Sequence, residues 1–136
     1  MSDASNVIKN ANLNWIKGLT FPAAPVAVYL SLFSTAVGDD NSGTEITGTI
    51  TGGNRPAVVW GAISGNELIK NTPAVTVTAS AAGAGTIVAI AIHTTATPAT
   101  GSLVVHKTLA APVNVVIGQS IVIPIDGLTI HIDKPC

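Results

Sequence analysis

A cluster of acidic residues is the part of this chain best suited to chemistry, because carboxylates are otherwise sparse. The stretch GDDNSGTEITG (38–48) contains three of the seven carboxylates, at Asp39, Asp40 and Glu45. An EF-hand takes calcium ligands from loop positions 1, 3 and 5 and a bidentate Glu at position 12. Counted from Asp39, position 5 is Gly43 and position 12 is Ile50, so the EF-hand pattern fails. A looser calcium site in a loop between strands remains an alternative.

Acid/base chemistry is not indicated for the same cluster. A working pair of carboxyl groups needs surroundings that separate the two pKa values. No nearby apolar or charged residue in the sequence provides such a difference. We therefore expect a solvated loop that turns the chain, as Asp, Asn, Ser and Gly commonly do.

Histidines and serines do not form a recognisable catalytic or metal motif. The chain has three histidines, with no His-x-His or His-x₃-His pair among them: His93, His106 and His131. Ser64 lies one place late for a G-x-S-x-G nucleophile elbow, and the glycine-rich GAGT (83–86) precedes an expected strand, so it offers no helix N-terminus for phosphate. We expect no enzyme, no metal site and no cofactor. A hydrolase that pairs a histidine with a serine remains an alternative for the tertiary structure to decide.

Composition points to a protein whose surface is covered by other subunits. Charged residues make up 10% of the 136 residues and hydrophobic residues 47%, whereas an ordinary soluble domain has about 25% charged residues. The longest apolar stretch, 87–92, is far shorter than the ~20 residues of a membrane helix. The N-terminus has no apolar stretch behind a basic start, so we expect neither a membrane partner nor a signal peptide. Self-association or docking onto a larger assembly is the natural interpretation.

Nucleic-acid binding is not expected, and an intrachain disulfide is impossible with one cysteine. The net charge is −1 and the six basic residues are spread along the chain, whereas phosphate neutralisation needs clustered cations. The single cysteine, Cys136, is the last residue.

The chain divides into an N-terminal arm over 1–20 and a β-sandwich domain over 21–136. A short helix is expected within 4–18, where Ser5 is a good N-cap and Gly18 lies where a helix ends in the left-handed region. Apolar residues recur at helical spacing between these two ends.

After the arm, alternating apolar residues predict an all-β domain. Turn signals at intervals of about ten residues predict an antiparallel sandwich, jelly roll or barrel of about seven to eight strands. Pro56 places its strand at an edge or at a strand start, and 85–94, apolar on both faces, is typical of a strand buried on both sides. Asp126-Gly127 predicts a hairpin between the last two strands. The expected strands are 25–34, 55–64, 74–80, 85–94, 101–109, 113–117, 119–125 and 128–133.

The stretch VYLSLFSTAVGDDNSGTEITG, followed by Arg55, resembles a stretch of small structural proteins of tailed bacteriophages. The early NVIKNANLNWIKGLT is also similar to the start of these proteins. A C-terminal pattern of glycines and alternating apolar residues matches as well, at Gly101, Leu103, Gly118, Ile121, Ile123, Gly127, Leu128 and Ile130. The chain departs from the family at Asn54, where the family has an aromatic residue, and at Pro56.

The resemblance implies a non-enzymatic β-sandwich on the virion surface, often trimeric, made in the host cytoplasm. It also implies an ion pair between Glu45 and Arg55 that braces the loop. The first expectation is a head decoration (cement) protein that binds the major capsid protein on the outside of the phage head. The alternative is a tail-fibre or baseplate component for host attachment.

Docking to a capsid protein or to a neighbouring subunit is expected from the apolar residues of the arm: Val7, Ile8, Leu13, Trp15 and Ile16. The equal alternative is that the same side chains cover an open end of the sandwich.

Overall fold

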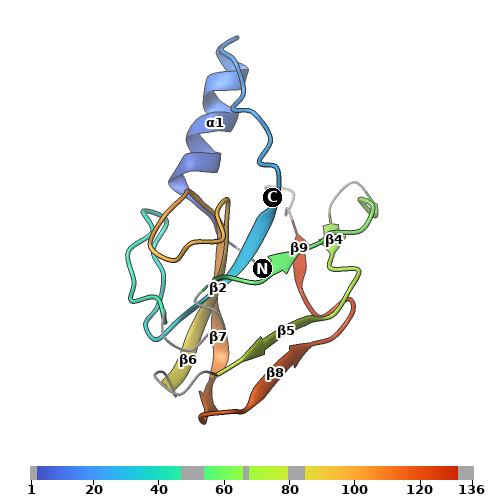
Figure 1. The fold of residues 1–136 in the computed structure, drawn as a ribbon. Coiled ribbons are helices and arrows are strands. Elements are labelled where there is room, and N and C mark those ends of the chain that lie inside the picture. The colour runs from blue at the N-terminus through green and yellow to red at the C-terminus, as the bar shows by residue number, and fades with distance from the viewer. Residues whose placement is uncertain (1–2, 47–53, 66–67, 80–84, 132–136) are drawn as a thin grey trace.

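A five-stranded antiparallel sheet forms the centre of the fold (Figure 1). The computed structural model describes residues 3–46, 54–65, 68–79 and 85–131. The strands of the central sheet follow one another in the order β1-β7-β6-β2-β3. Their bounds are β1 Asp3–Ala4, β7 Leu103–Val115, β6 Gly85–His93, β2 Val28–Phe33 and β3 Ala57–Val58.

Two small antiparallel sheets form a second layer against one face of the central sheet. β4 (Leu68–Lys70) pairs with β9 (Thr129–His131), and β5 (Val75–Thr78) pairs with β8 (Ser120–Ile123). The predicted all-β fold with a short N-terminal helix is thus confirmed. Within the described ranges, no helix is long and apolar enough to span a bilayer.

The main core lies between the two layers. Leu30 and Ile92 face it from the central sheet, and Val75 and Val77 face it from β5. A smaller apolar cluster, which includes Phe33, Val37 and Ala89, lies on the other face of the central sheet. β6 therefore contributes buried residues to both faces, which confirms the expectation for 85–94.

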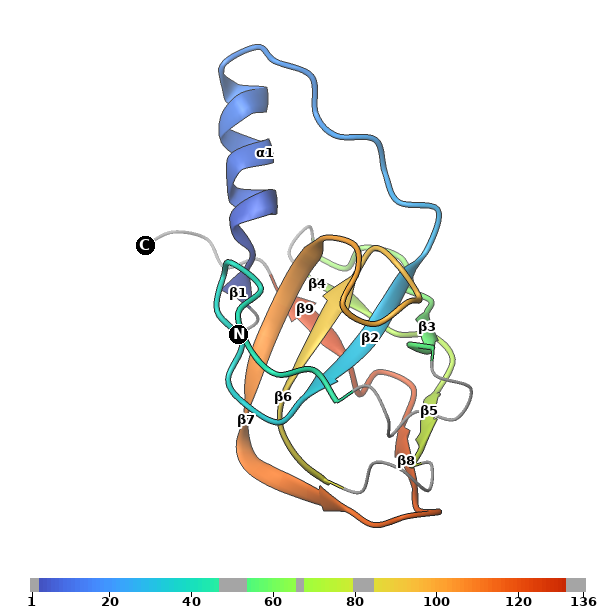
Figure 2. The ribbon, with the colours of Figure 1, turned by 60° about the vertical axis from the view of Figure 1, so that its left-hand side comes forward.

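The N-terminal helix α1 (Asn6–Ile16) begins and ends at the expected residues. Ser5 is the N-cap, and its hydroxyl oxygen accepts a hydrogen bond from the N–H of Ile8. Gly18 has a φ of 79°, and its N–H and that of Leu19 donate to the carbonyls of Trp15 and Asn14. These are the two bonds of a Schellman motif. Figure 2 shows α1 standing away from the sheets, with an extended connector that returns to β2.

Local signals gave the wrong strand boundaries in three places. The strand expected over 55–64 is reduced to β3 over Ala57–Val58. The strand expected over 25–34 begins at Val28, and Val26 is fully exposed in the connector before it. The strands expected over 101–109 and 113–117 form one strand, β7. Its register shifts between Thr108 and Val113, and this irregularity accommodates Pro112, which cannot donate to a ladder.

The hairpin predicted at Asp126-Gly127 is wrong. The chain does turn there, and the N–H of Gly127 donates to the carbonyl of Pro124 at 2.9 Å. However, β8 before the turn pairs with β5, whereas β9 after it pairs with β4. Strand β4 over Leu68–Lys70 has no counterpart among the strands expected from the sequence.

Asn71 explains why β8 and β9 join different sheets. Local sequence patterns did not single it out. It is fully buried, and its amide nitrogen donates to the carbonyl of Pro124 while its amide oxygen accepts from the N–H of Leu128 at 2.7 Å. Its backbone carbonyl accepts from the N–H of Asp126. One side chain thus fixes the turn between the two small sheets.

Candidate assembly surface and the loop that anchors it

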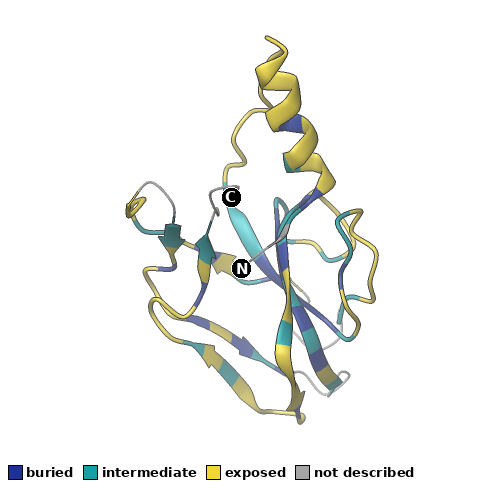
Figure 3. Cartoon of the chain, turned by 180° about the vertical axis from the view of Figure 1, so that it is seen from behind, coloured by how far each residue is buried: buried dark blue, intermediate teal, exposed yellow. Residues whose placement is uncertain are grey.

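The five residues expected to bind a partner all lie on helix α1. Four of them are exposed by 46% to 73%, and Ile8 is half-buried. The helix has one buried residue, Ala11, and Figure 3 shows α1 as a largely exposed element. Val7 and Trp15 lie on the Ala11 side of the helix, whereas Leu13 and Ile16 lie on another side, given 100° per residue. The helix therefore presents apolar side chains in several directions.

The backbone holds the base of this helix to the central sheet. β1 pairs with β7, and the N–H of Ser5 donates to the carbonyl of Val104 at 3.0 Å. The buried Ser5 hydroxyl donates to the carbonyl of Leu103. The N–H of Asn6 donates to the carbonyl of Asp39 at 2.9 Å.

Asp39, from the acidic cluster, ties the helix to the body through its side chain. One carboxylate oxygen accepts from the ammonium group of Lys9 on α1. The other lies 2.9 Å from Nε2 of His106 on β7. Hydrogen bonds from Lys9 and then His106 lower the pKa of Asp39 below its usual value. Asp39 therefore joins three elements that are distant in the sequence.

The next two residues of the cluster have partners of their own. Asp40 accepts from the N–H of Ser42 at 3.0 Å, an Asx turn that stabilises the loop locally. Hydrogen bonds from Ser42 also lower the pKa of Asp40. Asn41 has a φ of 64°, in the left-handed region, and its amide oxygen lies 3.0 Å from Nε2 of His93.

Glu45 and Arg55 form a bidentate ion pair. Nε and Nη2 of Arg55 donate to the two carboxylate oxygens at 2.6 and 2.8 Å. The side chains are only 1% and 9% exposed. Nη1 of Arg55 donates to the carbonyls of Thr95 and Thr100, both at 3.0 Å, and the N–H of Ala99 donates to Glu45 at 2.9 Å. The pair thus holds the loop between β6 and β7.

The pKa of Glu45 reflects two opposed effects. Burial raises it, because a charged carboxylate is poorly solvated inside the protein. Hydrogen bonds from Arg55 and Ala99 and the positive charge of Arg55 lower it by more, so the pKa ends below its usual value. Glu45 is therefore committed to its partner as a carboxylate.

The acidic residues do not converge on a common point. Asp39, Asp40 and Glu45 each bind a different partner, as described above. Within the part of the chain that the structure describes, no group of three or more His, Cys, Asp or Glu residues could hold a metal ion. The geometry supports a structural loop and gives no support to the calcium alternative.

A Ser31–His93–Asn41 array, in which Ser31 and His93 are buried, resembles a catalytic triad in composition. Oγ of Ser31 lies 2.7 Å from Nδ1 of His93, and Nε2 contacts Asn41. Both Ser31 and His93 are fully buried, and the Phe33 ring stacks on the imidazole with centroids 6.1 Å apart. The Ser31 hydroxyl donates to the carbonyl of Ala91 at 3.1 Å. Because a substrate cannot reach this serine, the array does not support the hydrolase alternative.

The electrostatics of His93 agree with a structural role. Burial lowers its pKa, and the nearby positive charge of Arg55 lowers it further, to about 4. The imidazole is therefore neutral at neutral pH. Each of its nitrogens has a polar neighbour, so the array satisfies polar groups inside the sheet.

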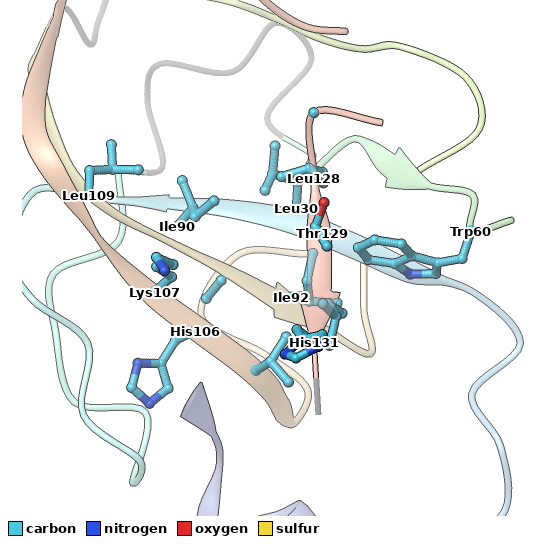
Figure 4. Close-up of a pocket in the computed structure, with 14 residues that line it drawn as sticks. Leu30, Trp60, Ile90, Ile92, His106, Lys107, Leu109, Leu128, Thr129 and His131 are labelled. Carbon is cyan, nitrogen blue, oxygen red and sulfur yellow. The ribbon is translucent and has the colours of Figure 1, made fainter. Parts of the chain in front are cut away.

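An apolar slit lies between the two layers, and Figure 4 shows its larger cavity. It consists of a cavity of about 370 Å³ and a second of about 240 Å³, which share four lining residues: Ile90, Leu109, Gly127 and Leu128. The larger cavity also has polar lining residues, among them Lys107 and His131. The sequence could not indicate the slit, because its walls come from strands distant along the chain.

Comparison with known proteins identifies one related family. The family model described as podophage GP4 fiber I protein gp80 matches residues 3–131. The matched range includes α1, both β layers and the loop with the acidic cluster. A search of curated proteins gave no match.

Proposed function

Because the chain belongs to the podophage GP4 fiber I protein gp80 family, we propose that it is a non-enzymatic structural component of a phage fibre. Family membership makes it a structural protein associated with the virion. Two roles were expected from the resemblance, a head decoration protein first and a tail-fibre or baseplate component as the alternative. The fibre description of the family favours the second role. Capsid decoration is not supported by the match.

The main support for this proposal is helix α1, which exposes apolar side chains and is held at its start by β1, Ser5 and Asp39. Trp15 and Ile16 are exposed by 66% and 73%. Full burial of such a side chain stabilises by about 1.5–3 kcal/mol. A helix that exposes several of them, and that Asp39 holds in place, is suited to permanent contact with another subunit.

The polar side chains that resemble a reactive centre serve structural contacts, which agrees with a role in assembly. Asp39 and Glu45 hold elements together, and the Ser31–His93 pair is closed to solvent. Self-association belongs to the proposal, with the trimer expected from the resemblance as its simplest closed form. The remaining partner is a neighbouring fibre or tail protein.

Localisation on purified particles tests the proposed function. We expect antibody-gold label on the fibre, and quantitative mass spectrometry should give few copies per particle relative to the major capsid protein. Label on the head at a ratio near one to one would replace the fibre proposal by capsid decoration. Absence from particles would overturn both.

A further inference from the structure

We propose that helix α1 and the connector after it dock onto a second copy of this chain, with the Trp15 side chain between strands β7 and β8. The inference deepens the proposed structural role by assigning both contact surfaces. Its occupant is a second copy because one chain carries both a projecting apolar element and an apolar slit that none of the described residues fills.

The slit is large enough for an aromatic ring. Protein interiors contain few voids larger than a water molecule, whereas an engineered apolar cavity of about 150 Å³ binds benzene. The smaller cavity here has about 240 Å³ and lies between β7 and β8. Val113 from β7 and Ile121 and Ile123 from β8 are among its lining residues. Among the described residues of the two layers, no side chain fills this apolar site.

The strands beside the slit have open edges. Within the described residues, β8 forms a ladder with β5 alone, and β7 from Thr108 onward forms a ladder with β6 alone. No charged residue occurs from Thr108 to Ile125. Native edges are usually protected by charge, by proline, by a bulge or by a covering segment. β7 has Pro112 and its register shift, but β8 has neither, so a covering segment is expected there.

The N-terminal arm exposes enough apolar surface area to cover the edge of β8 in a neighbouring copy. No charged residue occurs in 18–38. Together the exposed apolar side chains of the arm offer on the order of 600 Å², most of the ~800 Å² per partner of a standard interface. Those exposed by 46% or more are Val7, Leu13, Trp15, Ile16, Leu19, Phe21 and Val26.

The arm does not fill the slit of its own chain. Its base is fixed by Lys9–Asp39 and by β1, and Figure 2 shows α1 at the opposite end of the molecule from β8. Because the two surfaces differ, the contact between copies is heterologous. Such contacts form a closed ring when the rotation permits, and a ring of three is the expected trimer.

Complementary variants test the contact. Trp15→Glu damages the arm and Val113→Glu damages the slit, while Ile63→Glu is a control at an exposed site (71%) outside both surfaces. By analytical ultracentrifugation we expect the wild type and the control to self-associate, and each of the other two variants to weaken association by about 30-fold or more. A mixture of Trp15→Glu and Val113→Glu should give one-to-one dimers, because one intact arm meets one intact slit.

Two outcomes would overturn the inference. A wild type that stays monomeric at several hundred micromolar excludes a second copy as the occupant. A mixture that stays monomeric, with both variants folded by circular dichroism, means that the arm does not meet the slit.

Fluorescence gives an independent test in an otherwise unaltered chain. In a Trp60→Phe variant, Trp15 is the remaining tryptophan. Its emission should move to shorter wavelength as concentration rises, because the indole leaves water. Emission unchanged while the protein associates would show that another surface makes the contact. A monomer that nevertheless labels the fibre in virions would overturn this inference and self-association, and it would leave the structural role in the fibre standing.

Discussion

At the residue scale, the polar side chains of the acidic loop hold the loop to other elements of the fold through hydrogen bonds and ion pairs. Asp39 binds Lys9 and His106, Asn41 contacts His93, and Glu45 binds Arg55. Cation and hydrogen-bond partners stabilise the charged form of these carboxylates, which lowers their pKa values. Residues that resemble a reactive centre in the sequence thus hold loops and strands together.

Breaking the Glu45–Arg55 pair should be costly. Glu45→Gln leaves the guanidinium of Arg55 buried without its counter-charge, and we expect a loss of about 3 kcal/mol in the free energy of unfolding. Urea denaturation measures it. Asp126→Asn is the control, since Asp126 lies 3.9 Å from Lys70 and both are exposed, so its effect should stay within about 0.5 kcal/mol. Equal losses in both variants would contradict a special role for the buried pair.

His93 should make stability depend on pH. Its pKa is about 4 in the folded protein against an ordinary value of 6.5, so between these values the unfolded chain binds more protons than the folded one. The free energy of unfolding therefore falls as pH falls from about 6.5 to 4, by up to about 3 kcal/mol.

Denaturant titrations at several pH values measure the His93 contribution. His93→Gln removes it, so the difference between wild type and variant should shrink with falling pH. Glu45 and Asp39 also have lowered pKa values, and they reduce stability in the same direction at lower pH. A difference independent of pH would show that His93 titrates normally in the folded protein.

At the element scale, α1 is held at its base and is exposed along most of its length, with Ala11 as its one buried residue. The N-cap, the β1 pairing and Asp39 fix its start, and a Schellman motif ends it through hydrogen bonds to the carbonyls of its own last turn. Its orientation therefore depends on a small number of contacts near Ser5.

Removing the Asp39 carboxylate should loosen the helix without unfolding the body. In Asp39→Ala, the amides of 6–16 should exchange hydrogen several-fold faster by mass spectrometry, because Lys9 and His106 lose their shared partner. Asp40→Ala is the matched control, since Asp40 binds Ser42 within its own loop. Equal exchange in the two variants would mean that the backbone bonds alone hold the helix.

At the scale of the whole molecule, the two layers differ in how well their faces are packed. The central sheet is packed on both faces, by the main core and by the Phe33 cluster. The second layer consists of two sheets of two strands each, and the apolar slit lies beneath it. An isolated pair of strands is marginally stable in water, so the second layer depends on what covers it.

Hydrogen exchange should rank the strands accordingly. Amides of β6, between β7 and β2, should exchange slowest, and those of β8 should exchange fastest among the strands of four or more residues. Measurement by NMR in dilute and concentrated samples also tests the docking, since a neighbour's arm should slow exchange in β8 at high concentration. Protection in β8 equal to that in β6 in dilute solution would contradict the unequal layers.

The sequence by itself determined the features that depend on a few neighbouring residues. Ser5 and Gly18 bound the helix because capping uses backbone groups within one turn. The strand over 85–94 is buried on both faces because its apolar residues leave no polar side. The loop character of 38–48 follows from turn-forming residues, and the all-β class follows from alternation repeated along the chain.

Only the tertiary structure decided which strands pair and which polar residues meet. Asp126-Gly127 has the local chemistry of a hairpin, yet Asn71, more than fifty residues earlier, directs the chain to another sheet. Tertiary packing likewise brings Asp39 to His106 and Ser31 to His93. It also forms the apolar slit between the two layers. These contacts join residues far apart in the chain, and their energies depend on packing that a local pattern does not contain.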